Sequence, residues 1–255
     1  MQQFKYQESG SGKPFHFQHG LGSNLLQPQS LLTGLSGVRL ISMDCPGHGG
    51  AALPADTLPS FDFYADRLLA LMDQLGIEKA LFGGISMGAG ISTNIALRYP
   101  DRVLGLVLVR PAWLDQKMPD NLLILTEAAN WIGKANGLAT FSERADFGQI
   151  QQSLPKAAAS VLGVFAETQR PEIPTVLNAM VNDAPFTDLL ALQTINVPCL
   201  VIGNDADPLH PYEMAVAVHE QIKNSQLIKV TSRYLDDAQH REEVYQNVTK
   251  FITNL

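Results

Sequence analysis

The sequence predicts an α/β protein with a doubly wound, mostly parallel sheet and a helical cap insertion. Short apolar runs alternate with helical stretches over most of the 255 residues. Several runs are rich in Val, Ile and Leu without polar alternation, which is typical of parallel strands covered on both faces. One long stretch between two of the runs lacks any strand pattern. The strand–helix order implies right-handed crossovers between neighbouring strands.

The expected elements follow one another in a regular order. Six apolar runs are expected to form strands, at residues 13–18, 38–43, 79–83, 103–109, 197–203 and 226–230. Four stretches are expected to form helices, at residues 62–75, 86–99, 211–222 and 241–254. The first of these helices places Tyr64, Leu68 and Leu71 on one face. The second is nearly all small or apolar, so we expect it to be buried against the sheet.

Residues 113–195 do not continue the alternation of strands and helices, because their patterns are helical and interrupted by prolines. The segment is too long for a simple connection. We therefore interpret residues 1–112 and 196–255 as the core and residues 113–195 as a helical cap. The cap is either a structural buttress or a lid. A lid is favoured, because ligands bind where the carboxyl ends of parallel strands lie.

Composition excludes several classes of function. The net charge is −7, and no Lys/Arg cluster is present, so nucleic acid and anionic membrane are poor candidates as partners. No segment reaches the roughly 18 unbroken apolar residues that span a bilayer. The first residues, MQQFKYQESGSGK, lack the apolar centre of a signal peptide. We expect a cytoplasmic protein.

The two cysteines, Cys45 and Cys199, cannot form a disulfide framework. Cys199 lies inside a predicted core strand and is expected to be a small apolar residue. Cys45 lies in a loop, and we do not expect its thiol to be catalytic because a better nucleophile occurs later in the sequence. No CxxC or HExxH pair occurs, so nothing in the sequence indicates a metal site.

The strongest chemical signal is the G-x-S-x-G motif at residues 84–88, which follows an apolar strand and opens a helix. A serine on such a sharp turn sits in strained backbone geometry, and the flanking Gly84 and Gly88 leave room for the chain. The hydroxyl then stands at the positive end of the following helix. We interpret Ser86 as a nucleophile. The alternative is an ordinary N-cap serine.

A serine hydroxyl needs a base, and the base needs an orienting carboxylate. His240 is the predicted base, because it follows the last strand and a loop and directly precedes the final helix. Asp207 is the predicted carboxylate, since it lies just past a core strand. Asp205 is its rival, two residues earlier. Among the other histidines, His16 is expected to be structural.

Acyl transfer also needs donors for the oxyanion. The backbone N–H of Met87, directly after the nucleophile, is one expected donor. The Leu21 N–H is the other, in a His-Gly-Leu-Gly loop after an early strand. We expect His19 to shape that loop through hydrogen bonds and His48 to be structural.

Together these pieces resemble the α/β-hydrolase superfamily. The resemblance is carried by H-G-L-G at residues 19–22, D-x-P-G-H-G at residues 44–49, G-x-S-x-G at residues 84–88, Asp207 and His240. They occur in the order nucleophile, acid, histidine. The resemblance implies Ser86 as nucleophile, Asp207 as acid, His240 as base, and Leu21 and Met87 as oxyanion donors. It also implies that no cofactor is required.

The reaction expected is hydrolysis of a small ester, lactone or related carbonyl substrate. C–C bond hydrolysis, acyl transfer and perhydrolysis would reuse the same triad, and a ligand receptor on this fold is a further alternative. Arg110, at the end of a core strand, is a candidate for contacting a substrate carboxylate, although the alternative, an ion pair that anchors the insertion, is slightly favoured. Trp113 is a second candidate for substrate binding. The sequence leaves the substrate and the oligomeric state open, a homodimer included.

Overall fold

The computed structural model describes residues 3–166 and 170–255 of the chain. Its centre is a seven-stranded sheet in the order β1-β3-β2-β4-β5-β6-β7. The strands are β1 (Tyr6–Gly10), β2 (Lys13–Gln18), β3 (Val38–Met43), β4 (Ala80–Ile85), β5 (Val103–Val109), β6 (Cys199–Gly203) and β7 (Ser225–Lys229). All neighbours pair in parallel except β1, which is antiparallel to β3. The predicted fold class is confirmed.

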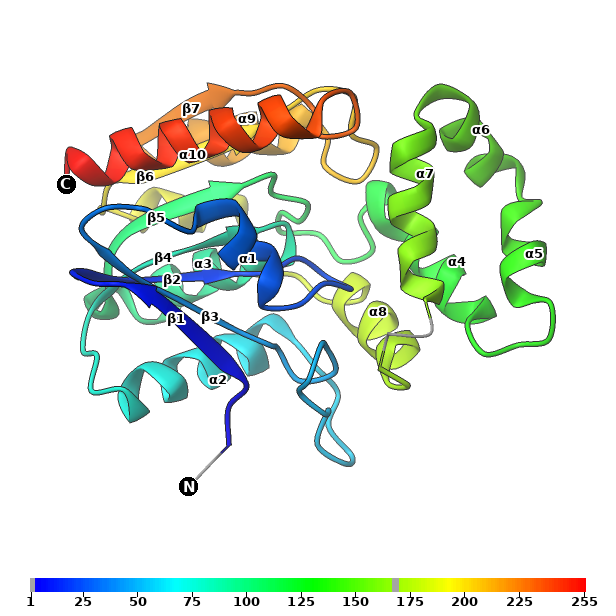
Figure 1. Cartoon of the computed structure of the whole chain (residues 1–255), viewed down its shortest axis with the longest axis horizontal. Helices are drawn as coiled ribbons and strands as arrows, with labels where there is room; N and C mark the ends of the chain where they lie inside the picture. Colours follow the sequence, from blue (N-terminus) through cyan, green and yellow to red (C-terminus); the bar gives the residue numbers. More distant parts are fainter. Residues whose placement is uncertain (1–2, 167–169) are drawn as a thin grey trace.

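Helices cover both faces of this sheet (Figure 1). The helices around the sheet are α1 (Leu26–Leu32), α2 (Phe61–Gln74), α3 (Met87–Arg98), α9 (Tyr212–Gln221) and α10 (Asp237–Thr253), and a 3-10 turn η1 (Pro100–Arg102) precedes β5. Apolar residues of α2, α3 and α9 form one core cluster, and those of α1 and α10 form a second. In β5, Leu106 and Leu108 belong to the first cluster, whereas Val107 and Val109 belong to the second. Burial on both faces explains why this strand has no polar alternation.

Strand β1 was not predicted, and its position explains why. It lies at the edge of the sheet and pairs with one neighbour, Tyr6 opposite Met43 at one end. Its sequence, YQESG, is exposed or half-buried throughout. An edge strand of this kind carries little apolar signal, because only one side of it needs to pack.

The segment between β5 and β6 forms a lobe of helices beside the carboxyl ends of the strands (Figure 1). Its elements are η2 (Asp120–Leu122), α4 (Leu123–Trp131), α5 (Gly137–Ser142), α6 (Ala145–Ser153), α7 (Pro155–Leu162), η3 (Gly163–Phe165), α8 (Ile173–Val181) and η4 (Leu189–Thr194). No strand occurs in the described residues of this segment, and residues 167–169 lie outside them. Its helical character is as expected, while a lid movement stays a prediction.

The start of the last helix differs from the prediction. Helix α10 begins at Asp237, and the Asp236 carboxylate accepts from the Gln239 N–H as N-cap. A side-chain cap of this kind fixes the first turn of a helix. His240 therefore lies inside the first turn of α10 and not in the loop before the helix. This shift changes what the imidazole can contact.

One further property concerns membranes. Within residues 3–166 and 170–255, none of the helices combines the length and apolarity that crossing a bilayer requires.

Candidate active site

Ser86 occupies the sharp turn that the motif predicts, between β4 and α3. Its backbone has φ 56° and ψ −111°, a region that non-glycine residues rarely adopt and that often marks functional positions. The Ser86 N–H donates to the Val109 carbonyl at 3.0 Å, which ties the turn to β5. A Cβ on Gly84 would lie 2.5 Å from the Gly88 carbonyl carbon, so the turn closes only because both positions are glycine.

The loop after β2 runs beside Ser86. A Cβ on Gly20 would lie 3.5 Å from the Ser86 Cβ, and Leu21 lines the same cavity as Ser86. Met87 is the first residue of α3, so its N–H is one of the helix donors without a partner in a preceding turn. Among the described residues, neither the Leu21 nor the Met87 N–H donates to another backbone group outside the regular elements. Both are thus free to serve as the predicted oxyanion donors.

His19 holds this loop in place, as expected. Its Nδ1–H donates to the Gly20 carbonyl at 2.8 Å, and its Nε2 accepts from the Cys45 N–H at 3.1 Å. The ring also lies 4.9 Å from that of His48, centroid to centroid. Burial lowers the pKa of His19 to about 4 and raises the pKa of the Cys45 thiol well above its ordinary value. These side chains are therefore neutral parts of the scaffold at neutral pH.

Asp207 lies in the loop after β6 and is 6% exposed. Its carboxylate accepts from the Leu209 N–H at 3.2 Å, from His210 Nδ1 at 2.8 Å and from Arg110 Nη1 at 3.2 Å. Burial alone would raise the pKa of Asp207, but His210 and Arg110 outweigh it and lower the pKa to about 2. The carboxylate is therefore ionised at neutral pH. Its rival, Asp205, is exposed and pairs with Lys229.

His210 is the residue that the sequence interpretation missed. It lines the same cavity as Ser86 and is 8% exposed. Because an ionised carboxylate only accepts, His210 Nδ1 carries the proton in the bond to Asp207, and Nε2 is left as an acceptor. Burial lowers the pKa of His210, so the ring is neutral at neutral pH. The sequence feature that could have identified His210 is its position three residues after Asp207, in the loop that follows β6.

His240 has different partners from those predicted. Its Nδ1–H donates to the Thr231 carbonyl at 2.7 Å, and it lines a second cavity that adjoins the first. In this structure Asp207 pairs with His210 and not with His240 as predicted, and the His240 ring bonds to the Thr231 carbonyl just past β7. Burial, with Arg110 and Arg233 nearby, lowers the pKa of His240 to about 4. Among the described residues, no hydrogen bond joins Ser86 Oγ to either imidazole.

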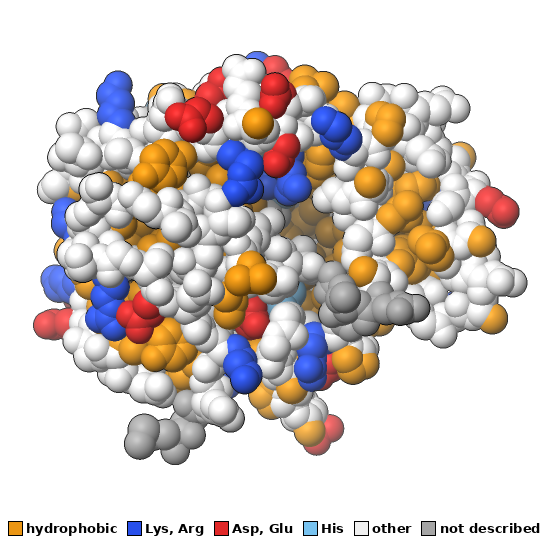
Figure 2. All heavy atoms as spheres, in the orientation of Figure 1, with side chains coloured by type: hydrophobic (Ala, Val, Ile, Leu, Met, Phe, Trp, Pro, Cys, Tyr) orange, Lys and Arg blue, Asp and Glu red, His pale blue; other side chains and the backbone are white. Residues whose placement is uncertain are grey.

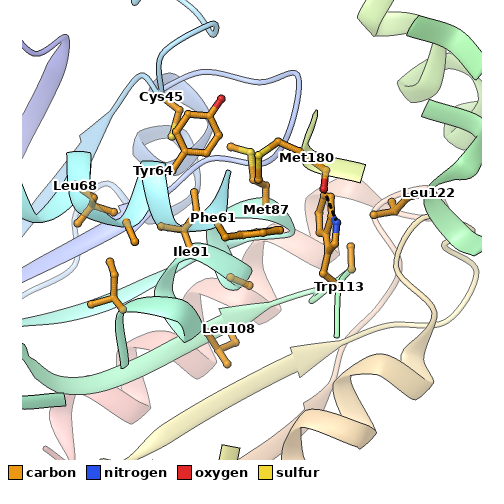
Figure 3. Close-up of a cluster of buried hydrophobic side chains, with 14 of the residues drawn as sticks. Cys45, Phe61, Tyr64, Leu68, Met87, Ile91, Leu108, Trp113, Leu122 and Met180 are labelled. Carbon is orange, nitrogen blue, oxygen red and sulfur yellow. Dashed lines mark hydrogen bonds between the residues drawn. The ribbon is translucent and has the colours of Figure 1, made fainter. Parts of the chain in front are cut away.

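The cavity over Ser86 measures about 80 Å³, well below the roughly 300–1,000 Å³ usual for small-molecule sites. The insertion supplies much of its wall, through Trp113, Leu122, Leu125, Ser160 and Val164. The Trp113 Nε1–H donates to the Met180 carbonyl at 3.1 Å, and its ring meets that of Phe61 edge-on (Figure 3). With its polar atom engaged, Trp113 offers only an apolar surface to a ligand.

Arg110 does not anchor the insertion. Its guanidinium pairs with Asp207 in the core, and the side chain is 4% exposed. Its backbone has φ 51°, another rarely adopted value directly after a core strand. Arg110 also lines the cavities beside Ser86 and beside His240, so a ligand in either of them can contact it. In residues 3–166 and 170–255, no group of three or more His, Cys, Asp or Glu side chains is arranged to hold a metal ion.

The sheet, the serine turn and the helical lobe together define an α/β-hydrolase architecture. The family model described as alpha/beta hydrolase fold matches residues 13–234, and the chain belongs to that family. The matched region contains Ser86, Asp207 and His210 and ends before His240.

Comparisons with single proteins agree on this family. The chain is 28% identical over 245 residues to a putative non-heme chloroperoxidase of Synechocystis sp., covering 87% of this chain and 84% of that protein. It is 35% identical over 120 residues to a putative non-heme haloperoxidase of Mycobacterium phage D29, covering 45% of this chain and only 41% of that protein. A thermophilic esterase from Thermogutta terrifontis shares the fold, with a TM-score of 0.78, 21% identity, and coverage of 98% of this chain and 93% of that one.

Proposed function

We propose that this protein is a serine hydrolase that cleaves a small ester, lactone or related carbonyl substrate through an acyl-enzyme on Ser86. One observation carries the proposal: Ser86, on its strained turn, shares a buried cavity with an imidazole that an ionised aspartate orients. The small volume of that cavity favours a short acyl group. No cofactor takes part in the proposed reaction.

In the first half-reaction, Ser86 Oγ attacks the substrate carbonyl and transfers its proton to a histidine. We assign this role to His210, since its Nε2 is the unprotonated nitrogen and its ring faces the cavity of Ser86. Asp207 fixes the tautomer and stabilises the imidazolium that forms. The Leu21 and Met87 N–H groups hold the oxyanion of the tetrahedral intermediate. The imidazolium then gives its proton to the departing alkoxide.

In the second half-reaction, a water molecule attacks the acyl group. His210 takes the proton of this water, a second tetrahedral intermediate forms at the same N–H groups, and Ser86 leaves with the proton returned by the imidazolium. The carboxylic acid is released and the enzyme returns to its starting state. Asp207 stays ionised throughout, in line with its pKa of about 2.

His240 is the alternative base. Its Nε2 is also unprotonated, because Nδ1–H donates to the Thr231 carbonyl. A backbone carbonyl can orient an imidazole, but it cannot stabilise the imidazolium as a carboxylate does. His240 lines a different cavity from Ser86, so the protein would have to move to bring the His240 ring to the serine.

The test is turnover of 4-nitrophenyl acetate and butyrate, together with labelling by a fluorophosphonate probe. We expect both in the wild type and neither in Ser86→Ala. Equal turnover by the two proteins would overturn the proposal. Absence of labelling in a folded wild type would favour the non-catalytic receptor that this fold also permits.

A second reaction is favoured by the haloperoxidase relatives. Hydrogen peroxide in place of water would attack the acyl-enzyme, forming a peracid and freeing Ser86. Formation of peracetic acid from acetate ester and peroxide, absent in Ser86→Ala, distinguishes this reaction from plain hydrolysis. C–C bond hydrolysis and acyl transfer to an alcohol would use the same serine, histidine and aspartate. Turnover of diketones would indicate the first reaction, and ester formation with added alcohols would indicate the second.

A further inference from the structure

A second cavity adjoins the one over Ser86 and is larger, at about 290 Å³. Gln27, Ile85, Arg110 and Arg233 line both cavities, so the two lie on either side of the same side chains. The wall that belongs only to the second cavity includes His240 and Arg241 from the first turns of α10. The proposed hydrolysis uses none of this space.

The second cavity is basic although the chain as a whole carries a net charge of −7. Three arginines line it, Arg110, Arg233 and Arg241, against one carboxylate, Asp237. The Arg233 Nε lies 3.8 Å from Asp237, beyond hydrogen-bond distance, and Arg241 binds the Ser30 carbonyl. Even with Asp207 counted beside Arg110, the arginines outnumber the carboxylates. Figure 2 shows Lys and Arg side chains gathered beside a hollow in this face of the molecule.

Arg110 supplies a second, independent observation. Its side chain is 4% exposed, and its Nε has no hydrogen-bond partner in the described part of the chain. Among the described residues, its Nη1 donates to Asp207. An unpaired buried donor on a charged group is costly, so native proteins seldom leave one without a ligand or water. Arg110 also lines this cavity, so an anion bound there would lie beside its guanidinium group.

The remaining lining residues suit an oxyanion. Ser23, Ser30 and Gln27 bring hydroxyl and amide groups to the same wall. Burial lowers the pKa of His240, and Arg110 and Arg233 lower it further, as expected where a positive potential prevails. A guanidinium fork matches the two oxygens of a carboxylate in a bidentate pair.

We propose that this cavity binds a carboxylate at the far end of the substrate whose reacting carbonyl lies at Ser86. This inference rests on the proposed function and narrows it to half-esters or carboxylated lactones. Arg233 and Arg241 hold the carboxylate, and Arg110 adds its positive charge beside it. Because Gln27, Ile85, Arg110 and Arg233 line both cavities, a substrate bound in both must pass beside these side chains.

The kinetic test compares methyl half-esters of succinate, glutarate and adipate with methyl esters of butyrate, valerate and hexanoate. We expect the wild type to prefer at least one half-ester over its neutral partner in kcat/KM. Arg233→Gln and Arg241→Gln should each reduce that preference by about tenfold, the effect of one charge-assisted hydrogen bond. Arg102→Gln is the matched control, because Arg102 lies at the amino end of β5, away from the carboxyl ends of the strands, and binds the Asp73 carboxylate and the Glu78 carbonyl.

A binding test separates this inference from the proposed function. Calorimetry with glutarate and with inorganic phosphate uses Ser86→Ala, so no turnover is needed. Glutarate binding that weakens about tenfold in Ser86→Ala/Arg241→Gln supports the site even if no ester is hydrolysed. Hydrolysis without half-ester preference and without glutarate binding overturns the site while leaving the hydrolase intact. Phosphate binding tighter than glutarate, with no half-ester preference, overturns the carboxylate assignment.

Discussion

His210 Nδ1 lies 2.8 Å from Asp207 Oδ1, and both side chains are buried beside the cavity of Ser86. This contact gives Ser86 an oriented imidazole that comes from the same loop as the acid. In the predicted arrangement the imidazole came from the loop before the final helix. The structure instead ties that second imidazole to the end of β7.

Because Asp207 orients the imidazole of His210, we expect that removing its carboxylate greatly reduces kcat. Asp207→Asn preserves the shape but lets the amide present a donor to Nδ1, which favours the wrong tautomer of His210. We expect kcat for a 4-nitrophenyl ester to fall by roughly 10³ to 10⁴, as in other serine triads. Asp205→Asn is the control, since Asp205 is exposed on the same loop. Similar rates for the two variants would contradict the assignment.

The pH profile follows from the pKa of the base. Burial lowers the pKa of His210 below its ordinary value, and only the neutral ring accepts a proton. Activity should therefore fall as the pH decreases, with the midpoint of the acid limb of kcat/KM below pH 6.5. Asp207 raises the pKa of His210, so the residual activity of Asp207→Asn should have its acid limb at still lower pH. A wild-type midpoint well above pH 6.5 would be inconsistent with this base.

The serine turn should be intolerant of a methyl group at Gly88. A Cβ there would collide with the Gln18 carbonyl oxygen and lie 2.7 Å from the carbonyl carbon. Since backbone cannot move aside cheaply, we expect Gly88→Ala to lower the free energy of unfolding by at least about 1–3 kcal/mol and to reduce ester turnover. Gly148→Ala is the matched control, because no atom lies within 4 Å of its Cβ in α6. That variant should gain about 0.5–1 kcal/mol.

The buried His16 should make the folded state less stable at acidic pH. It is fully buried in β2, neither ring nitrogen has a hydrogen-bond partner among the described residues, and burial lowers its pKa to about 3. Below pH 6.5 the unfolded chain binds a proton that the folded chain excludes, so stability is lost as the pH falls from 6.5 toward 3.

His16→Leu removes this contribution. Between pH 7 and pH 5, its free energy of unfolding should decrease by about 2 kcal/mol less than that of the wild type. Urea titrations at the two pH values measure the difference. Equal decreases in both proteins would show that His16 is protonated without penalty in the folded state.

The sequence predicted most of the sheet because buried parallel strands carry an unbroken apolar signal. Strand β5 was predicted with its observed bounds for this reason, whereas the polar edge strand β1 gave no such signal. The serine turn was predictable because its geometry demands small residues at fixed spacing. Each of these features depends on residues that are neighbours in the chain.

The partners within the site were harder to predict, since they depend on contacts between distant residues. The side-chain cap by Asp236 starts α10 early and turns His240 toward Thr231. Arg110, which forms a buried pair with Asp207, has a positive φ, and no sequence pattern marks that position. His210 was overlooked because a histidine so near the acid in sequence looks like part of the loop.

Comparing two variants tests the central claim most directly. His210→Gln and His240→Gln should both be folded by circular dichroism, and both should be assayed with 4-nitrophenyl acetate and a fluorophosphonate probe. We predict that His210→Gln loses at least about 10³-fold in kcat/KM, near the level of Ser86→Ala, while His240→Gln keeps activity within about tenfold of the wild type. Loss of activity in His240→Gln with full activity in His210→Gln would contradict the account.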